Sequence, residues 1–264
     1  MLLEGKKILI TGGVTGIGKA TAIVCAREGA SVVTVSRAKP TDQRAVETME
    51  ACRKAGSGKF GHVSADVSSR KAAFEAAEKA AELMGGIDCV VNCAGLETHG
   101  NAAEVEEEEM NRLFGVHVNG TIFTNQGALK YLQAAGGGTI LNFSSVAGVE
   151  GVVGMTAYTC CKGAIAAYSR QLAQEWGPYN IRVHALLPAV NTELAQRCYD
   201  DAADDVKWVY DALGEKVLLG TKKGYARLGD AKEVGNLVAF LASDLATFMT
   251  GQMIGVDGGM VMTR

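Results

Sequence analysis

Short runs of β-branched and other apolar residues alternate along the chain with longer, alanine-rich stretches whose apolar positions recur at helical spacing. The short runs are typical of strands that are buried on both faces, and the longer stretches are typical of amphipathic helices. Strands and helices that alternate in this way form parallel sheets, because each helix carries the chain back to the start of the next strand. The pattern therefore predicts an α/β fold, a doubly wound parallel sheet of about seven strands with helices on both faces.

No internal repeat or low-complexity linker interrupts this pattern, so residues 1–264 are expected to form a single domain. The predicted strands are Lys7–Thr11, Ser31–Ser36, Cys89–Asn92, Thr139–Ser144 and Ile181–Leu187, with Phe60–Val63 and Gly251–Val256 as two further candidates. The predicted helices are Gly18–Glu28, Gln43–Ala55, Arg70–Met84, Glu106–Ala134, Tyr158–Trp176 and Ala231–Leu241.

Composition narrows the classes of function. The chain has 264 residues, 48% of them hydrophobic, and a formal charge of -3 with scattered Lys and Arg, which gives a nucleic-acid partner little support. No stretch has the length to span a bilayer, and the first residues lack the apolar region of a signal peptide. We therefore expect a cytoplasmic protein without a membrane partner. The seven cysteines lack the spacing of a zinc site and the density of a disulfide framework, so we expect reduced thiols and no metal.

A glycine-rich turn, Thr11-Gly12-Gly13-Val14-Thr15-Gly16-Ile17-Gly18, follows the first predicted strand and opens the first predicted helix. Backbone amides at such a turn and the helix N-terminus can hold a pyrophosphate. The same spacing on its own is also compatible with an ordinary strand-to-helix turn.

A second motif lies in the predicted helix that begins at Tyr158. Tyr158 and Lys162 are four residues apart, so they share one face of a helix. A fixed cation favours the phenolate and brings the tyrosine pKa down from about 10 toward the working pH, which makes Tyr158 a candidate acid and base. Ser145 lies upstream, after the predicted strand that ends at Ser144.

This ordered set, the glycine turn followed by Ser145, Tyr158 and Lys162, resembles the classical short-chain dehydrogenase/reductase family over essentially the whole chain. The resemblance implies a Rossmann-type fold and hydride transfer between a nicotinamide cofactor and a small-molecule carbonyl or secondary alcohol. It implies that Tyr158 passes the proton and that Ser145 holds the substrate oxygen. Lys162 would hold the nicotinamide ribose and lower the pKa of Tyr158.

The resemblance also implies which residues hold the cofactor. They are Gly12, Thr15, Gly16, Ile17, Gly18, Ser36, Arg37, Asp66, Val67, Asn92, Ala94, Gly95, Tyr158, Lys162, Val190 and Thr192. Among the residues near the cofactor, Cys93 departs from the family pattern, because it stands where a second asparagine is usual.

The end of the second predicted strand bears on the choice of cofactor. An acidic residue there would hold the ribose hydroxyls of NAD and would repel a 2′-phosphate. Here Ser36 takes that place and Arg37 follows it, which favours NADP(H) and keeps NAD(H) as the alternative. Arg37 could instead stack on the adenine or point to solvent.

His117 aligns with an asparagine that completes the family's usual catalytic set and holds a water linking the lysine to solvent. Three roles are open for the histidine. It could relay protons through a ring nitrogen, titrate near neutrality and make activity pH dependent, or only fill space.

The resemblance places substrate choice in a lid at about residues 190–225, where apolar residues recur at helical spacing. A mobile lid suits an extended hydrophobic substrate, and a helix packed permanently on its own domain is the alternative. Gly136 and Tyr179 replace two arginines with which ketoacyl reductases of the family dock an acidic carrier protein. We therefore favour a hydrophobic cyclic or hydroxysteroid-like alcohol or ketone.

Other functions stay open at this point. They are an NAD-dependent sugar or short-chain alcohol dehydrogenase, a 3-oxoacyl reductase, and a cofactor-binding regulator with weak activity. The C-terminal run Gly251–Gly259 resembles the family pattern for assembly, which implies a homotetramer.

Overall fold

Seven parallel strands form the central sheet of the computed structural model, which describes residues 1–201, 204–219 and 228–262. The strands lie in the order β3-β2-β1-β4-β5-β6-β9. The order of the chain reverses between β1 and β4, which is where open α/β sheets bind their ligands. The strands are β1 (Lys7–Thr11), β2 (Ser31–Ser36), β3 (Phe60–Ser64), β4 (Cys89–Asn92), β5 (Gly138–Phe143), β6 (Ile181–Pro188) and β9 (Met253–Val256).

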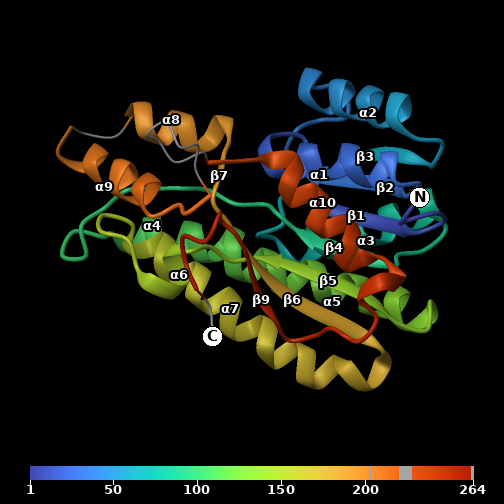
Figure 1. The fold of residues 1–264 in the computed structure, drawn as a ribbon. Helices are drawn as coiled ribbons and strands as arrows, with labels where there is room; N and C mark the ends of the chain where they lie inside the picture. The colour runs from blue at the N-terminus through green and yellow to red at the C-terminus, as the bar shows by residue number, and fades with distance from the viewer. Residues whose placement is uncertain (202–203, 220–227, 263–264) are drawn as a thin grey trace.

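Helices cover both faces of the sheet, as predicted (Figure 1). On one face α1 (Gly16–Arg27) packs against α10 (Ala231–Ala242), with α2 (Gln43–Ala55) beside α1. The other face is covered by α3 (Arg70–Met84), α5 (Gly120–Ala134) and α7 (Thr156–Trp176). No helix in the described part of the chain has the length and apolar character to cross a membrane.

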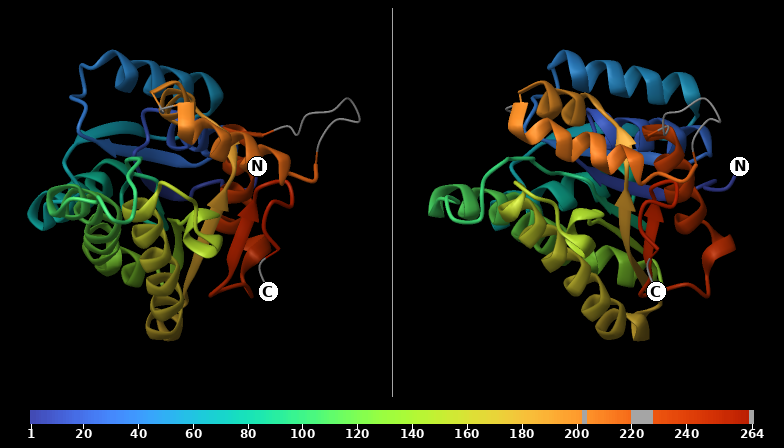
Figure 2. Two further views of the ribbon diagram at one scale, coloured as in Figure 1. Left: turned by 90° about the vertical axis from the view of Figure 1, so that its left-hand side faces the viewer. Right: turned by 60° about the vertical axis from the view of Figure 1, so that its left-hand side comes forward.

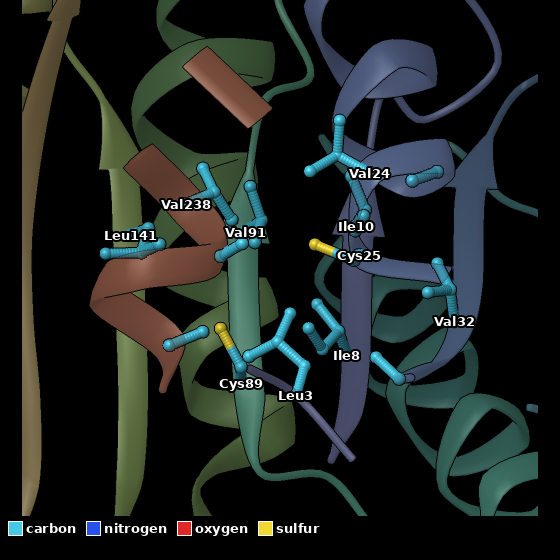
Figure 3. Close-up of a cluster of buried hydrophobic side chains, with 14 of the residues drawn as sticks. Leu3, Ile8, Ile10, Val24, Cys25, Val32, Cys89, Val91, Leu141 and Val238 are labelled. Atoms are coloured by element: carbon cyan, nitrogen blue, oxygen red, sulfur yellow. The ribbon is translucent and has the colours of Figure 1, made fainter. Parts of the chain in front are cut away.

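The sheet separates two apolar cores. Successive side chains of a strand point to opposite faces, so Ile8 and Ile10 of β1 enter one core and Leu9 enters the other. Figure 3 shows the first core, where Ile8 and Ile10 lie near Val91 of β4 and Val238 of α10. Because both faces are buried, the strands appear in the sequence as continuous apolar runs, which explains why they could be predicted.

The predicted lid contains two helices, α8 (Glu193–Asp201) and α9 (Asp204–Glu215), which lie beyond the carboxyl end of β6 (Figure 2). Its residues 202–203 and 220–225 lie outside the described part of the chain. A short parallel pair, β7 (Val190–Asn191) with β8 (Gly229–Asp230), holds the two ends of this region together. This pair of strands was not predicted from the sequence.

The predicted helix Glu106–Ala134 is wrong in its middle. It is divided into α4 (Glu107–Phe114), a π-helical turn at Gly115–Asn119, and α5. A π-helical turn holds an extra residue and changes the direction in which the following side chains point, and such turns are frequent at functional sites. His117 lies inside this turn.

Candidate active site

The carboxyl ends of the parallel strands meet at one edge of the sheet, where a cleft with a volume of about 700 Å³ lies. It extends from the residues after β2, past the end of β1, to the loop after β4. Eight residues that were predicted to bind the cofactor line the cleft: Gly12, Thr15, Ser36, Arg37, Asp66, Val67, Ala94 and Gly95.

The glycine turn gives the cleft an anion-binding end. Residues 16–18 form the first turn of α1, Thr15 precedes it without a side-chain cap, and the turn contains no acidic residue. The first amides of α1 are therefore open to a phosphate at the positive end of the helix dipole. Gly12 has φ of 67°, and a Cβ there would lie 2.8 Å from the nitrogen of Ala94. Only glycine lets the turn approach the loop after β4 this closely, so these residues fit a dinucleotide.

The chain returns to the glycine turn after β6. A Cβ on Gly16 would lie 3.7 Å from Cβ of Thr192, which is ordinary contact distance. Val190 is 9% exposed and pairs with Gly229 in the short β7–β8 sheet. Thr192 thus borders the first turn of α1, and Val190 is buried beside it. The contacts of both residues with a cofactor stay predictions.

Basic side chains surround the end of the cleft beyond β2. Arg37 and Lys39 are exposed and line the cleft together with Ser36. Arg44 also lines it, but its Nε and Nη2 donate to the carboxylate of Asp42 at 2.9 and 2.8 Å. These hydrogen bonds lower the pKa of Asp42 to about 2, so the charges of Asp42 and Arg44 offset each other. Arg37 and Lys39 remain as a positive charge at this end.

Asp66 and Asn92, which were also predicted to contact the cofactor, differ in whether they line the cleft. Asp66 lines the cleft, and hydrogen bonds from Ser68, with a smaller effect of Arg37, lower the pKa of its carboxyl. Asn92 is 3% exposed and does not belong to the cleft lining; its Nδ2 donates to Oδ1 of Asn125 at 2.7 Å and of Asn142 at 2.9 Å. Asn92 therefore joins β4 to β5 and α5 through its side chain, and its expected contact with the cofactor stays a prediction.

Tyr158 and Lys162 lie on α7, as their spacing predicts. The Nζ of Lys162 lies 5.3 Å from the centre of the Tyr158 ring and donates a 2.8 Å hydrogen bond to the carbonyl of Phe143. Lys162 is only 6% exposed, and burial lowers its pKa to about 8 although Cys93, Cys161 and Glu97 oppose the shift. A cation is thus fixed close to the phenol and loses its proton more easily than an exposed lysine.

Ser145 follows β5 on a segment that is tied to the same helix. Ser144 Oγ donates to the carbonyl of Lys162 at 2.8 Å, and Ser145 Oγ accepts from the nitrogen of Ala147 at 3.2 Å. A Cβ on Gly148 would lie 2.6 Å from the carbonyl carbon of Lys162, so glycine is needed for this approach. The fold therefore brings the Ser145 segment against the turn of α7 that carries Lys162, 17 residues along the sequence from Ser145.

Comparison with known proteins identifies the family. The family model described as enoyl-(acyl carrier protein) reductase matches residues 12–261. A short-chain dehydrogenase/reductase from Serratia marcescens superimposes with a TM-score of 0.85 at 29% identity, over 98% of this chain and 99% of that one. The chain belongs to the short-chain dehydrogenase/reductase family. Its members are oxidoreductases that act on alcohol and ketone groups with NAD(P), and the chain is an enzyme of this class.

Two further relatives carry more specific names. The 3-oxoacyl-[acyl-carrier-protein] reductase FabG of Thermotoga maritima is 33% identical over 99% of this chain and 100% of its own length. The 3-ketoacyl-(acyl-carrier-protein) reductase of Brucella melitensis, solved with NADH, has a TM-score of 0.82 and 30% identity over 98% of this chain and 100% of that one.

His117, where the short-chain dehydrogenase/reductase family usually has asparagine, is 1% exposed. Its Nε2 lies 3.0 Å from the nitrogen and 2.7 Å from the carbonyl oxygen of Leu96, and its ring lies edge-on to Tyr158 at 5.6 Å between centres. Burial, with the charge of Lys162, lowers the pKa of His117 to about 3. The imidazole is therefore neutral at neutral pH, and the hypothesis that it titrates there is wrong. A relay through the neutral ring stays a prediction.

Cys93 also departs from the family pattern. Burial raises the pKa of its thiol to about 12, so it is a neutral packing group. The backbone nitrogens of Cys93 and Ala94 each donate to Oγ1 of Thr11 at 3.2 Å. This contact joins the ends of β1 and β4 through backbone atoms of Cys93 and Ala94.

Several residues of the cleft were not predicted from the sequence. Lys39 lies three residues beyond Ser36 and could have been found from the run of basic residues after the second strand. Leu96 and Val116 come from separate segments that only the tertiary fold brings together, and neither carries a chemical signal. The role of Thr11 required the pairing of β1 with β4.

Proposed function

We propose that this protein interconverts a ketone and a secondary alcohol with NADP(H), and that Tyr158 is its acid and base. The observation that carries the proposal is the buried ammonium of Lys162, 5.3 Å from the centre of the Tyr158 ring. A positive charge at that place stabilises the phenolate and lets the phenol give up or regain a proton near neutral pH. The nicotinamide, when bound, supplies or accepts the hydride.

The other residues of the site have assigned tasks in this proposal. Ser145 donates a hydrogen bond to the substrate oxygen and stabilises negative charge that develops there. The first turn of α1 holds the pyrophosphate through its open amides, and Lys162 also holds the nicotinamide ribose. The contacts of the Ser145 segment with α7 support this assignment, since they keep the hydroxyl, phenol and ammonium on neighbouring parts of the fold.

The preference for NADP(H) is supported by the charge at the end of β2. Ser36 replaces the acidic residue that would repel a 2′-phosphate, and the cleft lining adds Arg37 and Lys39. NAD(H) is the second candidate, favoured by the NADH in the relative from Brucella melitensis.

The substrate that we propose is a hydrophobic cyclic or hydroxysteroid-like ketone or alcohol. Support comes from apolar side chains next to Ser145, because Val146 packs with Val217 after α9 and with Met260. Val153 and Leu218 add apolar side chains that are 67% and 66% exposed. Reduction of 3-oxoacyl groups is the second candidate, because the relative from Thermotoga maritima is a 3-oxoacyl-[acyl-carrier-protein] reductase. The absence of arginine at positions 136 and 179 speaks against it.

The protein is also proposed to act as a homotetramer. The edge strand β9 and the segment before it support this, because Leu245 and Phe248 are 68% and 104% exposed. Apolar side chains at a sheet edge are commonly covered by another subunit.

The enzyme proposal can be tested by the oxidation of NADPH and NADH, measured by absorbance with steroid, alicyclic and short aliphatic ketones. We expect the highest kcat/KM with NADPH and a cyclic ketone.

Tyr158→Phe should lower turnover by about 100-fold or more without loss of cofactor binding, because general acid–base catalysis contributes that much. Tyr179→Phe, at an exposed tyrosine after α7, is the matched control, and its turnover should equal that of wild type. Cofactor binding without turnover on any ketone would favour the regulator hypothesis instead.

A further inference from the structure

His62, in the middle of β3, bonds to three residues on or just after the neighbouring strand β2. It is the register partner of Thr34, whose Oγ1 lies 2.8 Å from His62 Nδ1. The other ring nitrogen, Nε2, lies 3.0 Å from the carbonyl oxygen of Ala38 and 3.4 Å from Oγ of Ser36. The imidazole therefore connects Thr34 in β2 to Ala38, which lies in the segment that follows β2.

The partners of His62 settle which ring nitrogen carries the hydrogen. A carbonyl oxygen only accepts, so Nε2 must donate to Ala38, and Nδ1 of the neutral ring must accept from the hydroxyl of Thr34. Thr34 is fully buried, and burial lowers the pKa of His62, which favours this neutral form. The ring is thus held at both nitrogens in one orientation.

This orientation fixes the turn at residues 36–39. The nitrogen of Ala38 donates to Ser36 Oγ at 3.2 Å, while the carbonyl of Ala38 accepts from His62. The hydroxyl of Ser36 accepts in this contact and so keeps its own hydrogen for a ligand. Arg37 lies between these two anchored residues, and its backbone position is therefore set from both sides.

The turn lines one end of the cofactor cleft. Ser36, Arg37 and Lys39 all belong to the cleft lining, and the two cations are exposed. Arg44, the other basic residue that lines this end of the cleft, donates two hydrogen bonds to Asp42. The turn consequently supplies one hydroxyl donor and two cations, which are groups that bind a phosphate monoester well.

We propose that His62 is a positioning residue that holds the turn 36–39 in the shape that binds a phosphate on the adenosine ribose. The inference rests on the proposed preference for NADP(H) and adds the residue on which that preference depends. His62 itself does not line the cleft, so it acts through Ser36 and Ala38.

The test uses binding rather than turnover, so that it does not depend on the substrate. Calorimetry measures the dissociation constants of 2′,5′-ADP, which carries the ribose phosphate, and of 5′-AMP, which lacks it. The variants are His62→Leu, which removes both hydrogen bonds, and His62→Gln, whose amide can still donate to the carbonyl of Ala38. Ser31→Ala is the matched control, because it removes a 3.0 Å hydrogen bond from Lys59 at the other end of the same strand pair.

Wild type is expected to bind 2′,5′-ADP more tightly than 5′-AMP. His62→Leu should raise the dissociation constant of 2′,5′-ADP by about tenfold and change that of 5′-AMP by no more than about twofold. A tenfold change matches the free energy that the loss of a hydrogen bond near a charged group costs. His62→Gln should recover most of the loss. Ser31→Ala should keep the wild-type ratio even if it lowers the melting temperature.

The outcomes separate this inference from the proposed cofactor preference. A wild type that prefers 2′,5′-ADP, with the same ratio in His62→Leu, would overturn the role of His62 and keep the preference. If His62→Leu weakened the binding of both nucleotides equally, His62 would be a structural residue of the sheet and the proposal would be wrong. A wild type without preference for 2′,5′-ADP would overturn both.

Discussion

Lys162 shows how far single residues could be predicted. Its spacing from Tyr158 indicated that the two share one face of a helix, and the structure confirms this. The sequence could not reveal that its ammonium is buried and donates to the carbonyl of Phe143, 19 residues away on β5. That contact depends on how α7 packs on the sheet. The neutral state of His117 was equally out of reach, since it follows from burial beside Leu96 and Lys162.

The pKa of Lys162 predicts a pH dependence of stability. Its value in the folded protein, about 8, lies below the ordinary 10.5. Between these values the unfolded chain holds a proton that the folded chain lacks, so stability increases as the pH rises through this window. The free energy of unfolding of wild type relative to Lys162→Met should increase by on the order of 3 kcal/mol.

Urea unfolding of both proteins at a series of pH values measures this difference. Lys79→Met, at an exposed lysine of α3, is the control, and its difference from wild type should not change with pH. A flat difference for Lys162→Met as well would show that the buried ammonium keeps an ordinary pKa.

Strands and helices were predicted well where their apolar pattern is strong. β1, β2, β4, α2 and α3 begin and end at the predicted residues, because each is bounded by a turn and has a continuous buried run or face. The π-helical turn Gly115–Asn119 was missed, because one extra residue leaves almost no trace in a helical pattern. β7 and β8 were missed because two residues are too few to form a recognisable run.

The neutral imidazole of His117, which lies in the π-helical turn, leads to a prediction about the pH dependence of activity. Because its imidazole is neutral over the usual range of histidine titration, His117→Asn should show the same pH profile of kcat/KM as wild type between about pH 5 and 8. His117→Leu should lower the free energy of unfolding by about 1–3 kcal/mol, because it removes the hydrogen bond between Nε2 and the part-buried backbone of Leu96. A wild-type inflection near neutrality that disappears in His117→Asn would restore the titrating role.

At the scale of the whole molecule, the parallel sheet is what assembles the site. All seven strands run the same way, so residues from the first, second and fourth strands meet at one edge although they are far apart in sequence. The sequence predicted this gathering through the alternation of strands and helices. It could not predict how the lid lies, since the contact of Val217 with Val146 joins two distant segments.

Assembly can be predicted from the exposed apolar edge near β9. Phe248 is 104% exposed, and its burial by a second subunit would favour association through the hydrophobic effect. Light scattering should give the mass of four chains for wild type, and Phe248→Asp should reduce it. Leu83→Asp, at an exposed leucine of α3, is the control and should keep the tetramer. A monomeric wild type would contradict the proposed assembly.

The central claim is that the protein transfers a hydride between the cofactor and a carbonyl carbon, with Tyr158 as the proton donor. The most direct measurement is deuterium transfer from NADPH labelled at the hydride position to the ketone that turns over best, followed by mass spectrometry and NMR of the product. Wild type should give an alcohol with one deuterium on the former carbonyl carbon, and Tyr158→Phe should give almost no alcohol. An alcohol without deuterium, or equal product from both proteins, would contradict it.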